Sequence, residues 1–125
     1  MTETTREPTS MYRARETDVI VVKRTPTGVE AWIHRCGGRP SLRLPHVGHH
    51  SPTGFEYGYE GSGPADLAWS ILAVCTHPET AQELHQLFKR ELVAQQKADR
   101  WMVRVRAVRE WIGDALVENE HGDFR

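Results

Sequence analysis

The chain has 125 residues, of which 38% are hydrophobic and 26% charged, with Lys+Arg 16 against Asp+Glu 17. This length predicts one domain, and the near balance of charge excludes an overall field that would attract nucleic acid or a membrane surface. No apolar run reaches the roughly 18 residues of a membrane span, and the N-terminal MTETTREPTS lacks the basic and apolar regions of a signal peptide. We therefore expect a cytoplasmic protein. Cys36 and Cys75 lie far apart in the sequence, and Cys75 lies in an apolar helical run where a small buried thiol is common, so we favour free thiols over the alternative of a single disulfide.

The start of the chain, residues 1–10, is rich in Thr, Glu, Pro and Ser and has nothing to bury, so we expect a mobile arm there. Residues 11–120 are expected to form a single α+β domain. Residues 121–125, HGDFR, look like a frayed tail.

Strand signals dominate the first half of the chain. The β-branched run in DVIVVKR, a turn over residues 25–28 and the alternating VEAWIHR predict a β-hairpin. A short edge strand follows over residues 41–44, ended by Pro45. Residues 55–59 place aromatic side chains at alternate positions, which predicts a further strand with one aromatic face.

Helical signals dominate the second half. Pro64 suits the first position of a helix, where its missing N–H costs nothing, and ADLAWSILAVC continues to residue 75 without a breaker. Thr76 and Glu79 have the spacing of a capping box and predict a second helix from about residue 77.

The last element is ambiguous, because Trp101 and the residues after it fit both a strand and a helical stripe. We favour a short strand over residues 101–104 and a helix over residues 105–118. The predicted fold class is α+β: a small, mainly antiparallel sheet, formed by the N-terminal hairpin and the strand over residues 55–59, packed against two or three helices.

The stretch HSPTGFEYGYEGSGPADLAWSIL resembles the signature of a family of small uncharacterised proteins met in bacteriophages, plasmids, actinobacteria and halophilic archaea. The family's run is close to HSPTGFEWGYGGSGPAQLALAIL, so Tyr57, Glu60 and Asp66 stand where the family has Trp, Gly and Gln. The resemblance extends more weakly over most of the chain. It implies a shared fold and a mobile-element context, and it implies no activity.

A possible anion site lies within this stretch, because a glycine-rich turn that opens a helix presents unpaired N–H groups and a partial positive charge. The polar HSPTG before the turn is not explained by fold rules and leaves room for further contacts. The competing interpretation is a plain connection, since Pro64 removes one N–H and Glu60 and Asp66 add negative charge. The candidate ligand-binding residues are His50, Ser51, Tyr57, Tyr59, Gly61, Ser62 and Gly63.

A hydrolase or transferase is the first alternative. His50 would act as the base, Glu56 or Asp66 would orient it, and Ser51 or Ser62 would be the nucleophile. No G-x-S-x-G elbow surrounds either serine, and the spacing does not require these groups to meet.

A metal site would use the histidine cluster His46, His49 and His50. Zinc sites usually take their ligands from two separated short-spaced pairs, and this chain has no second pair. We therefore expect neither a metal nor a cofactor.

Weak nucleic-acid binding is a further alternative, through Lys97, Arg100, Arg104 and Arg106 on a basic helical face followed by an acidic tail. That stretch has no interleaved exposed aromatics and no helix-turn-helix pattern, so solvated helix faces explain it as well. Our leading hypothesis is a small non-enzymatic accessory protein of phage or mobile-element type. It would bind a partner protein or a small phosphorylated ligand, for example to counter a host defence; the sequence predicts no oligomeric state.

Overall fold

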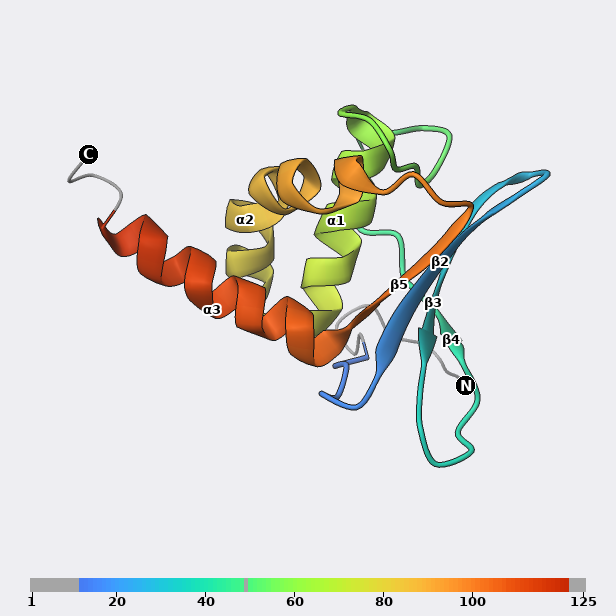
Figure 1. Cartoon of the computed structure of the whole chain (residues 1–125), viewed down its shortest axis with the longest axis horizontal. Coiled ribbons are helices and arrows are strands. Elements are labelled where there is room, and N and C mark those ends of the chain that lie inside the picture. Colours follow the sequence, from blue (N-terminus) through green and yellow to red (C-terminus); the bar gives the residue numbers. More distant parts are fainter. Residues whose placement is uncertain (1–11, 49, 122–125) are drawn as a thin grey trace, which may run out of the picture.

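A computed structural model describes residues 12–48 and 50–121. Within them the chain forms a four-stranded antiparallel sheet and three α-helices, which confirms the α+β prediction. The helices all lie on one face of the sheet (Figure 1). The arm expected over residues 1–10 lies outside the described residues, as does the expected tail apart from His121. The elements are β2 (Val19–Thr25), β3 (Gly28–His34), β4 (Leu42–Arg43), α1 (Ser62–Cys75), α2 (Pro78–Glu91), the 3-10 helix η2 (Val93–Gln95), β5 (Arg100–Arg104) and α3 (Val105–His121).

The sheet has the strand order β4-β3-β2-β5, so a strand from the second half of the chain pairs with the N-terminal hairpin. Val22 of β2 lies opposite Ala31 of β3 and Trp101 of β5. Residues opposite one another share a face, and these three side chains are buried beneath the helices together with Ile20 and Ile33. Burying a large aliphatic side chain contributes about 1.5–3 kcal/mol relative to exposure. The predicted hairpin, edge strand and strand near residue 101 are confirmed.

Helix α1 lies between α2 and the sheet (Figure 1), with 11 of its 14 residues buried. Its apolar side chains join the same core as Phe88 of α2 and Val108 of α3. Because most of α1 is buried, two of its polar side chains, Asp66 and Ser70, are buried as well, each with 0% exposure. A buried polar group is costly unless it is hydrogen-bonded, so these two side chains need partners.

The prediction of a strand over residues 55–59 is wrong. These residues belong to an irregular segment, described over residues 44–48 and 50–61 and hereafter called the 44–61 loop, which connects β4 to α1. Gly54 and Gly58 have φ of 104° and 89°, which turns the chain out of the extended conformation. The Gly58 N–H donates to the carbonyl of Val93 in η2 rather than to a strand. Tyr57 is 2% exposed and Tyr59 52%, so the aromatic side chains do not share one face.

Both predicted helix starts need correction in detail. Helix α1 begins at Ser62 after an N-cap at Gly61, so Pro64 is its third residue rather than its first. An N–H at the third position has no partner within the helix either, so proline's lack of an N–H still costs nothing there. Helix α2 begins at Pro78, within a residue of the prediction, but without a side-chain cap. The predicted capping box does not form. Thr76 instead ends α1, where its N–H donates to the carbonyl of Leu72.

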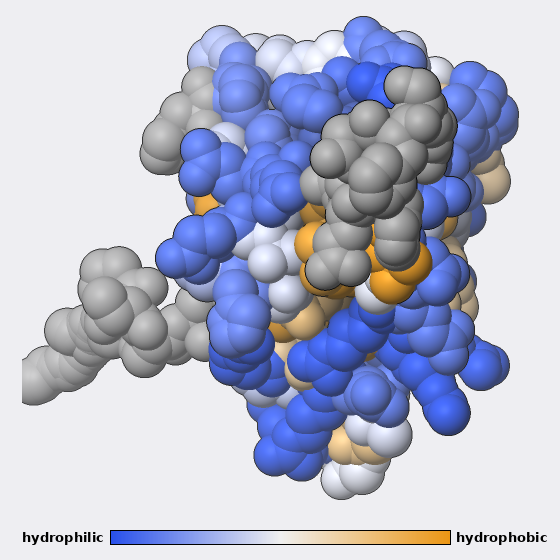
Figure 2. Space-filling model, turned by 90° about the vertical axis from the view of Figure 1, so that its left-hand side faces the viewer, coloured by the Kyte–Doolittle hydropathy of each residue, from blue (hydrophilic) through white to orange (hydrophobic). Residues whose placement is uncertain are grey.

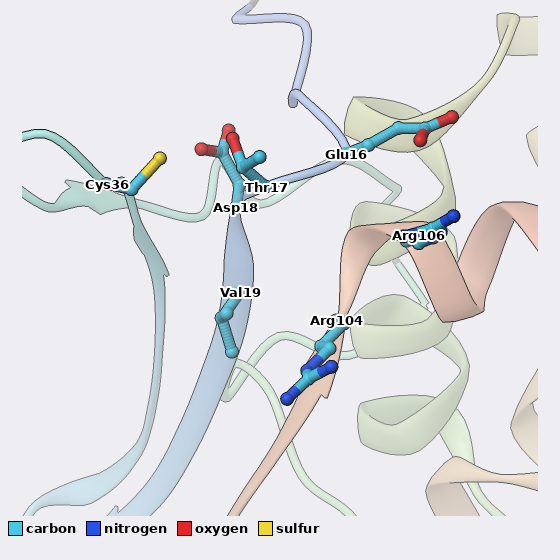
Figure 3. A pocket seen from close by; sticks show the side chains of 7 residues that line it. All are labelled: Glu16, Thr17, Asp18, Val19, Cys36, Arg104 and Arg106. Carbon is cyan, nitrogen blue, oxygen red and sulfur yellow. The ribbon is translucent and has the colours of Figure 1, made fainter.

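Hydrophilic residues cover most of the helical side of the molecule, and hydrophobic ones show there only in small patches (Figure 2). A pocket of about 350 Å³ opens where β2 begins and β5 ends, lined by residues 16–19, Cys36, Arg104 and Arg106 (Figure 3). Among the described residues, no helix is long and apolar enough to cross a membrane.

Candidate functional site

The 44–61 loop is the most unusual feature of the fold, because irregular segments of this length are uncommon in compact domains and usually carry function. Its first half contains the HSPTG stretch that fold rules left unexplained. The structure shows that the loop is ordered by polar side chains of helix α1.

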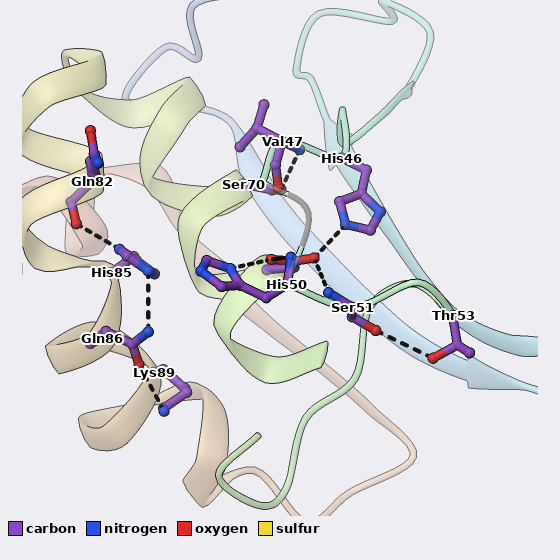
Figure 4. A network of polar contacts seen from close by, with 11 residues as sticks. His46, Val47, His50, Ser51, Thr53, Ser70, Gln82, His85, Gln86 and Lys89 are labelled. Atoms are coloured by element: carbon purple, nitrogen blue, oxygen red, sulfur yellow. Dashed lines mark hydrogen bonds and ion pairs between the residues drawn. The ribbon is translucent and has the colours of Figure 1, made fainter. Parts of the chain in front are cut away.

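Asp66 is the centre of this arrangement, and both of its carboxylate oxygens accept hydrogen bonds from the loop. Figure 4 shows the residues that supply the donors, His46, His50 and Ser51, gathered at the start of α1. Its Oδ1 accepts the His50 backbone N–H at 3.1 Å and the His50 Nδ1–H at 2.7 Å. Its Oδ2 accepts the His46 Nε2–H at 2.9 Å and the Ser51 backbone N–H at 3.0 Å. One turn further along α1, Ser70 Oγ accepts the Val47 N–H at 2.9 Å. The loop is thus held against α1 through the backbone N–H groups of Val47, His50 and Ser51.

The charge state of Asp66 follows from this environment. Burial opposes ionisation of Asp66, but the hydrogen bonds from His46, Ser51 and His50 together outweigh it and lower the pKa of the carboxyl. The carboxylate is therefore ionised at neutral pH and carries no proton to donate. Each histidine nitrogen facing it must then be the protonated one, which sets the tautomer when the ring is neutral.

His50 is held in one orientation by this contact. Because Nδ1 is committed to Asp66, Nε2 is the ring nitrogen left for an outside group, and the side chain is 40% exposed. Its ring lies 5.4 Å from that of Trp69 and 5.5 Å from that of His85, while Trp69 and His85 stack at 4.5 Å. The loop backbone approaches the same helix closely at Gly48, where an added Cβ would lie 2.9 Å from Trp69.

The neighbouring His85 has a different character. It is 7% exposed, and burial lowers the pKa of its imidazole, so the ring is neutral at pH 7. Its Nδ1 donates to the carbonyl of Gln82, and its Nε2 is then free to accept from the Gln86 amide at 3.3 Å. His85 therefore supports the Trp69 ring as a polar but uncharged neighbour.

Two of the groups predicted for catalysis come together, because the His50 ring is hydrogen-bonded to Asp66. The other candidate carboxylate, Glu56, pairs instead with Arg24 at 3.0 Å. The Ser51 backbone bonds Asp66, and its hydroxyl lies 3.3 Å from that of Thr53. The structure thus brings a histidine and a carboxylate together, with Ser51 placed as part of the loop anchor.

The predicted glycine-rich turn is packed closely against the loop. A Cβ on Gly63 would lie 2.7 Å from Glu56 Cβ, and one on Gly61 would lie 2.7 Å from the Tyr59 ring. Gly63 is needed so that the loop can lie against the first turn of α1, whereas at Gly61 the exposed Tyr59 ring can move aside. Ser62 between them is exposed.

Of the two candidate tyrosines, Tyr57 is committed to the interior. Its hydroxyl donates to the Ala98 carbonyl at 2.7 Å, its ring meets Trp101 edge to face, and Arg24 covers it at 4.6 Å. Stacking on a ligand is therefore open only to Tyr59.

The four basic residues predicted for nucleic acid do not form one helical face. Arg100 and Arg104 lie on β5, Arg106 lies on α3, and Lys97 donates to the Gly58 carbonyl at 3.0 Å. For the predicted histidine cluster, His46 and His50 meet at Asp66, and His49 lies outside the described residues. Within the part of the chain that the structure describes, no group of three His, Cys, Asp or Glu could hold a metal ion.

Asp66 was named from the sequence as a possible partner of His50 and as a charge against anion binding, but Trp69 and Ser70 were missed. Asp66, Trp69 and Ser70 have the i, i+3, i+4 spacing of one helix face, which was a usable signal. His85 comes from α2, and nothing in the sequence around it indicated that it would lie beside Trp69 and His50. The two cysteines are free, as favoured from the sequence; Cys36 is exposed and Cys75 is buried.

Comparison with known proteins gives one match. A family model described as a family of unknown function, DUF6166, matches residues 21–114, which include every residue of this site. No curated protein and no solved structure matches significantly.

Proposed function

Because the chain belongs to the DUF6166 family, which has no assigned function, we propose from the site geometry that it acts by binding a small phosphorylated ligand at His50. The protein would be a non-enzymatic, cytoplasmic accessory protein. The resemblance of its HSPTG stretch to phage and plasmid proteins supports a role on a mobile element, for example against a host defence. Binding of a partner protein by the same loop is the other form of this proposal.

The observation that carries the proposal is the fourfold hydrogen bonding of buried Asp66. An ionised, saturated carboxylate holds His50 with Nδ1 inward and Nε2 outward. A protonated imidazole in this place donates Nε2–H to a phosphate oxygen in a charge-assisted hydrogen bond. Trp69, half-buried beside it and already stacked on His85, adds an aromatic contact for a base. The arrangement is preorganised, which reduces the entropic cost of binding.

The test is a thermal-shift screen with inorganic phosphate, nucleotides, cyclic dinucleotides and phosphosugars. A ligand present at 100 times its Kd stabilises the folded state by about 2.7 kcal/mol, which raises the Tm measurably. His50→Ala should abolish the shift, while His34→Ala, an exposed histidine in β3, should preserve it. The proposal fails if no compound raises the Tm, or if His50→Ala retains the full shift.

One observation favours a second candidate, a hydrolase or transferase. A buried carboxylate 2.7 Å from Nδ1 orients His50 as the carboxylate of a catalytic triad orients its base. In this reading Nε2 takes a proton from Ser51, Ser62 or water. His50→Gln should then abolish turnover of a substrate found by screening esters and phosphodiesters. Unchanged turnover in that variant would remove His50 from the mechanism, and reversible binding without turnover would favour the first proposal.

A further inference from the structure

The sheet has a second face, opposite the helices, which the site does not use. Alternation along β2 places Ile20 and Val22 in the core, so the residues between and beside them face the other way. The strand register extends this outer face to the other strands. Among the described elements no helix covers it (Figure 1). The outer face consists of Val19, Val21, Lys23, Glu30, Trp32, His34, Arg43, Arg100, Met102 and Arg104.

An apolar row crosses the middle of this face. Val21 lies opposite both Trp32 and Met102, and Trp32 lies opposite Arg43. The Trp32 ring is half-buried, with the Arg43 guanidinium 4.7 Å from its centroid. Met102, at the other end of the row, is 54% exposed. Val21, between them, is 2% exposed, so Met102 and the half-buried Trp32 supply the apolar surface of the row. Apolar surface bordered by charge favours an interaction site.

Cations border the row on both sides. On one side Lys23 lies opposite Arg100, and on the other Val19 lies opposite Arg104. Each border is two residues along the strand from the row, about 7 Å at roughly 3.4 Å per residue. The face carries four Lys and Arg residues and a single acid, Glu30, which already contacts Trp32 Nε1 and Arg43. Lys23, Arg100 and Arg104 have no ion pair among the described residues.

We propose that the outer face binds single-stranded nucleic acid. A base stacks on the Trp32–Arg43 pair, in which the guanidinium lies over the ring, and against Met102, while phosphates lie against the cations on either side. An acidic peptide would satisfy the cations but would not use an aromatic and apolar row between them. The pocket at the start of β2 adjoins this face at Arg104, and its lining also includes Arg106 (Figure 3). The pocket offers room for a base at the end of β5.

This site differs from the basic helical face predicted from the sequence. On the outer face itself only Arg100 and Arg104 belong to both, because β5 is a strand whose alternate residues face outward; Arg106 lines the adjoining pocket. Trp32, Lys23 and Arg43 come from the first half of the chain. The site also lies on the opposite side of the sheet from α1, so it is independent of the ligand proposed at His50.

The experiment uses the full chain and a fluorescein-labelled oligothymidylate of about 15 nucleotides, followed by fluorescence anisotropy from 50 to 300 mM NaCl. Affinity should fall with salt, and the Arg100→Gln/Arg104→Gln double variant should lower the magnitude of the log–log salt slope by about 1.4, or about 0.7 per lost phosphate contact. Trp32→Ala should weaken binding about tenfold with little change in the slope, because it removes a stacking surface. Arg90→Gln, an exposed cation on α2, is the matched control and should leave both unchanged.

Four results would overturn the proposal: no binding at 50 mM NaCl, a loss in Arg90→Gln equal to that in the Arg100→Gln/Arg104→Gln double variant, equal affinity for a duplex of the same length, or displacement of the oligonucleotide by polyglutamate at equal charge concentration. If Trp32→Ala fails to fold, Trp32→Phe replaces it as the test of the stacking surface, because Phe keeps a smaller aromatic ring. The arginine pair, which is exposed, tests the phosphate contacts separately.

Discussion

Asp66→Asn tests whether the buried carboxylate holds the 44–61 loop in place. The variant keeps the size of the side chain and one oxygen, and it replaces the other oxygen with an NH₂ group. Each oxygen of Asp66 accepts one backbone N–H and one histidine N–H. Whichever way the amide is turned, its NH₂ therefore faces a backbone N–H. A histidine ring can respond by changing tautomer, but a backbone N–H cannot become an acceptor.

The expected loss can be worked out from these contacts. A hydrogen bond to a charged group contributes about 1.5–3 kcal/mol, and an unpaired buried donor costs about 1–3 kcal/mol. The side chains of His46 and His50 are 35% and 40% exposed and can turn to water, so only the backbone donor counts in full. The neutral amide also escapes the cost of burying a charge. We therefore expect the free energy of unfolding to fall by about 2–3 kcal/mol.

Urea unfolding at pH 7 measures this loss as a lower midpoint at an unchanged m-value. Hydrogen exchange supplies a local readout, since the amides of His50 and Ser51 should lose protection before the core does. Asp114→Asn, an exposed aspartate of α3, is the matched control and should change stability by less than about 0.5 kcal/mol. A loss below about 0.5 kcal/mol in Asp66→Asn, or continued protection of the Ser51 amide, would refute the reasoning.

Three further predictions follow from packing and burial. Gly63→Ala should lower the free energy of unfolding by about 1–3 kcal/mol, because its Cβ would overlap Glu56, whereas Gly113→Ala in an open part of α3 should raise it by about 0.5–1 kcal/mol. Equal effects in urea titrations would contradict the close packing of the loop. Burial lowers the pKa of His85, so as the pH falls below about 6.5 the unfolded chain takes up the proton before the folded protein does. The Tm of the parent protein should therefore fall more between pH 7 and pH 5 than the Tm of His85→Gln. Parallel curves of Tm against pH for the two proteins would contradict this. Burial raises the pKa of Cys75 to about 12, so a thiol reagent at pH 8 should modify one cysteine in the folded protein and two in urea, and rapid modification of both when folded would count against its burial.

The strands and helices that could be predicted were those with a periodic pattern of their own. The β-branched run around Ile20 predicts a strand because alternate burial is a local property of an extended chain. Residues 55–59 show the limit of that argument. Their aromatic alternation is real in the sequence, but Gly58 turns the chain and Tyr57 packs against Trp101 from a loop, which no local pattern records.

The sequence by itself determined the class of the fold, the hairpin, the three helices and the position of the polar stretch around His50, because each rests on neighbours a few residues apart. Only the tertiary structure decided what these parts do together. Asp66 is an ordinary helical acid until α1 is buried, and burial obliges it to collect donors from a loop 15 to 20 residues earlier. The outer face likewise exists only because Arg43 and Met102, far apart in the chain, are brought into one row by pairing with β3 and β2. A local pattern cannot specify such contacts, since they depend on which surfaces the whole chain buries.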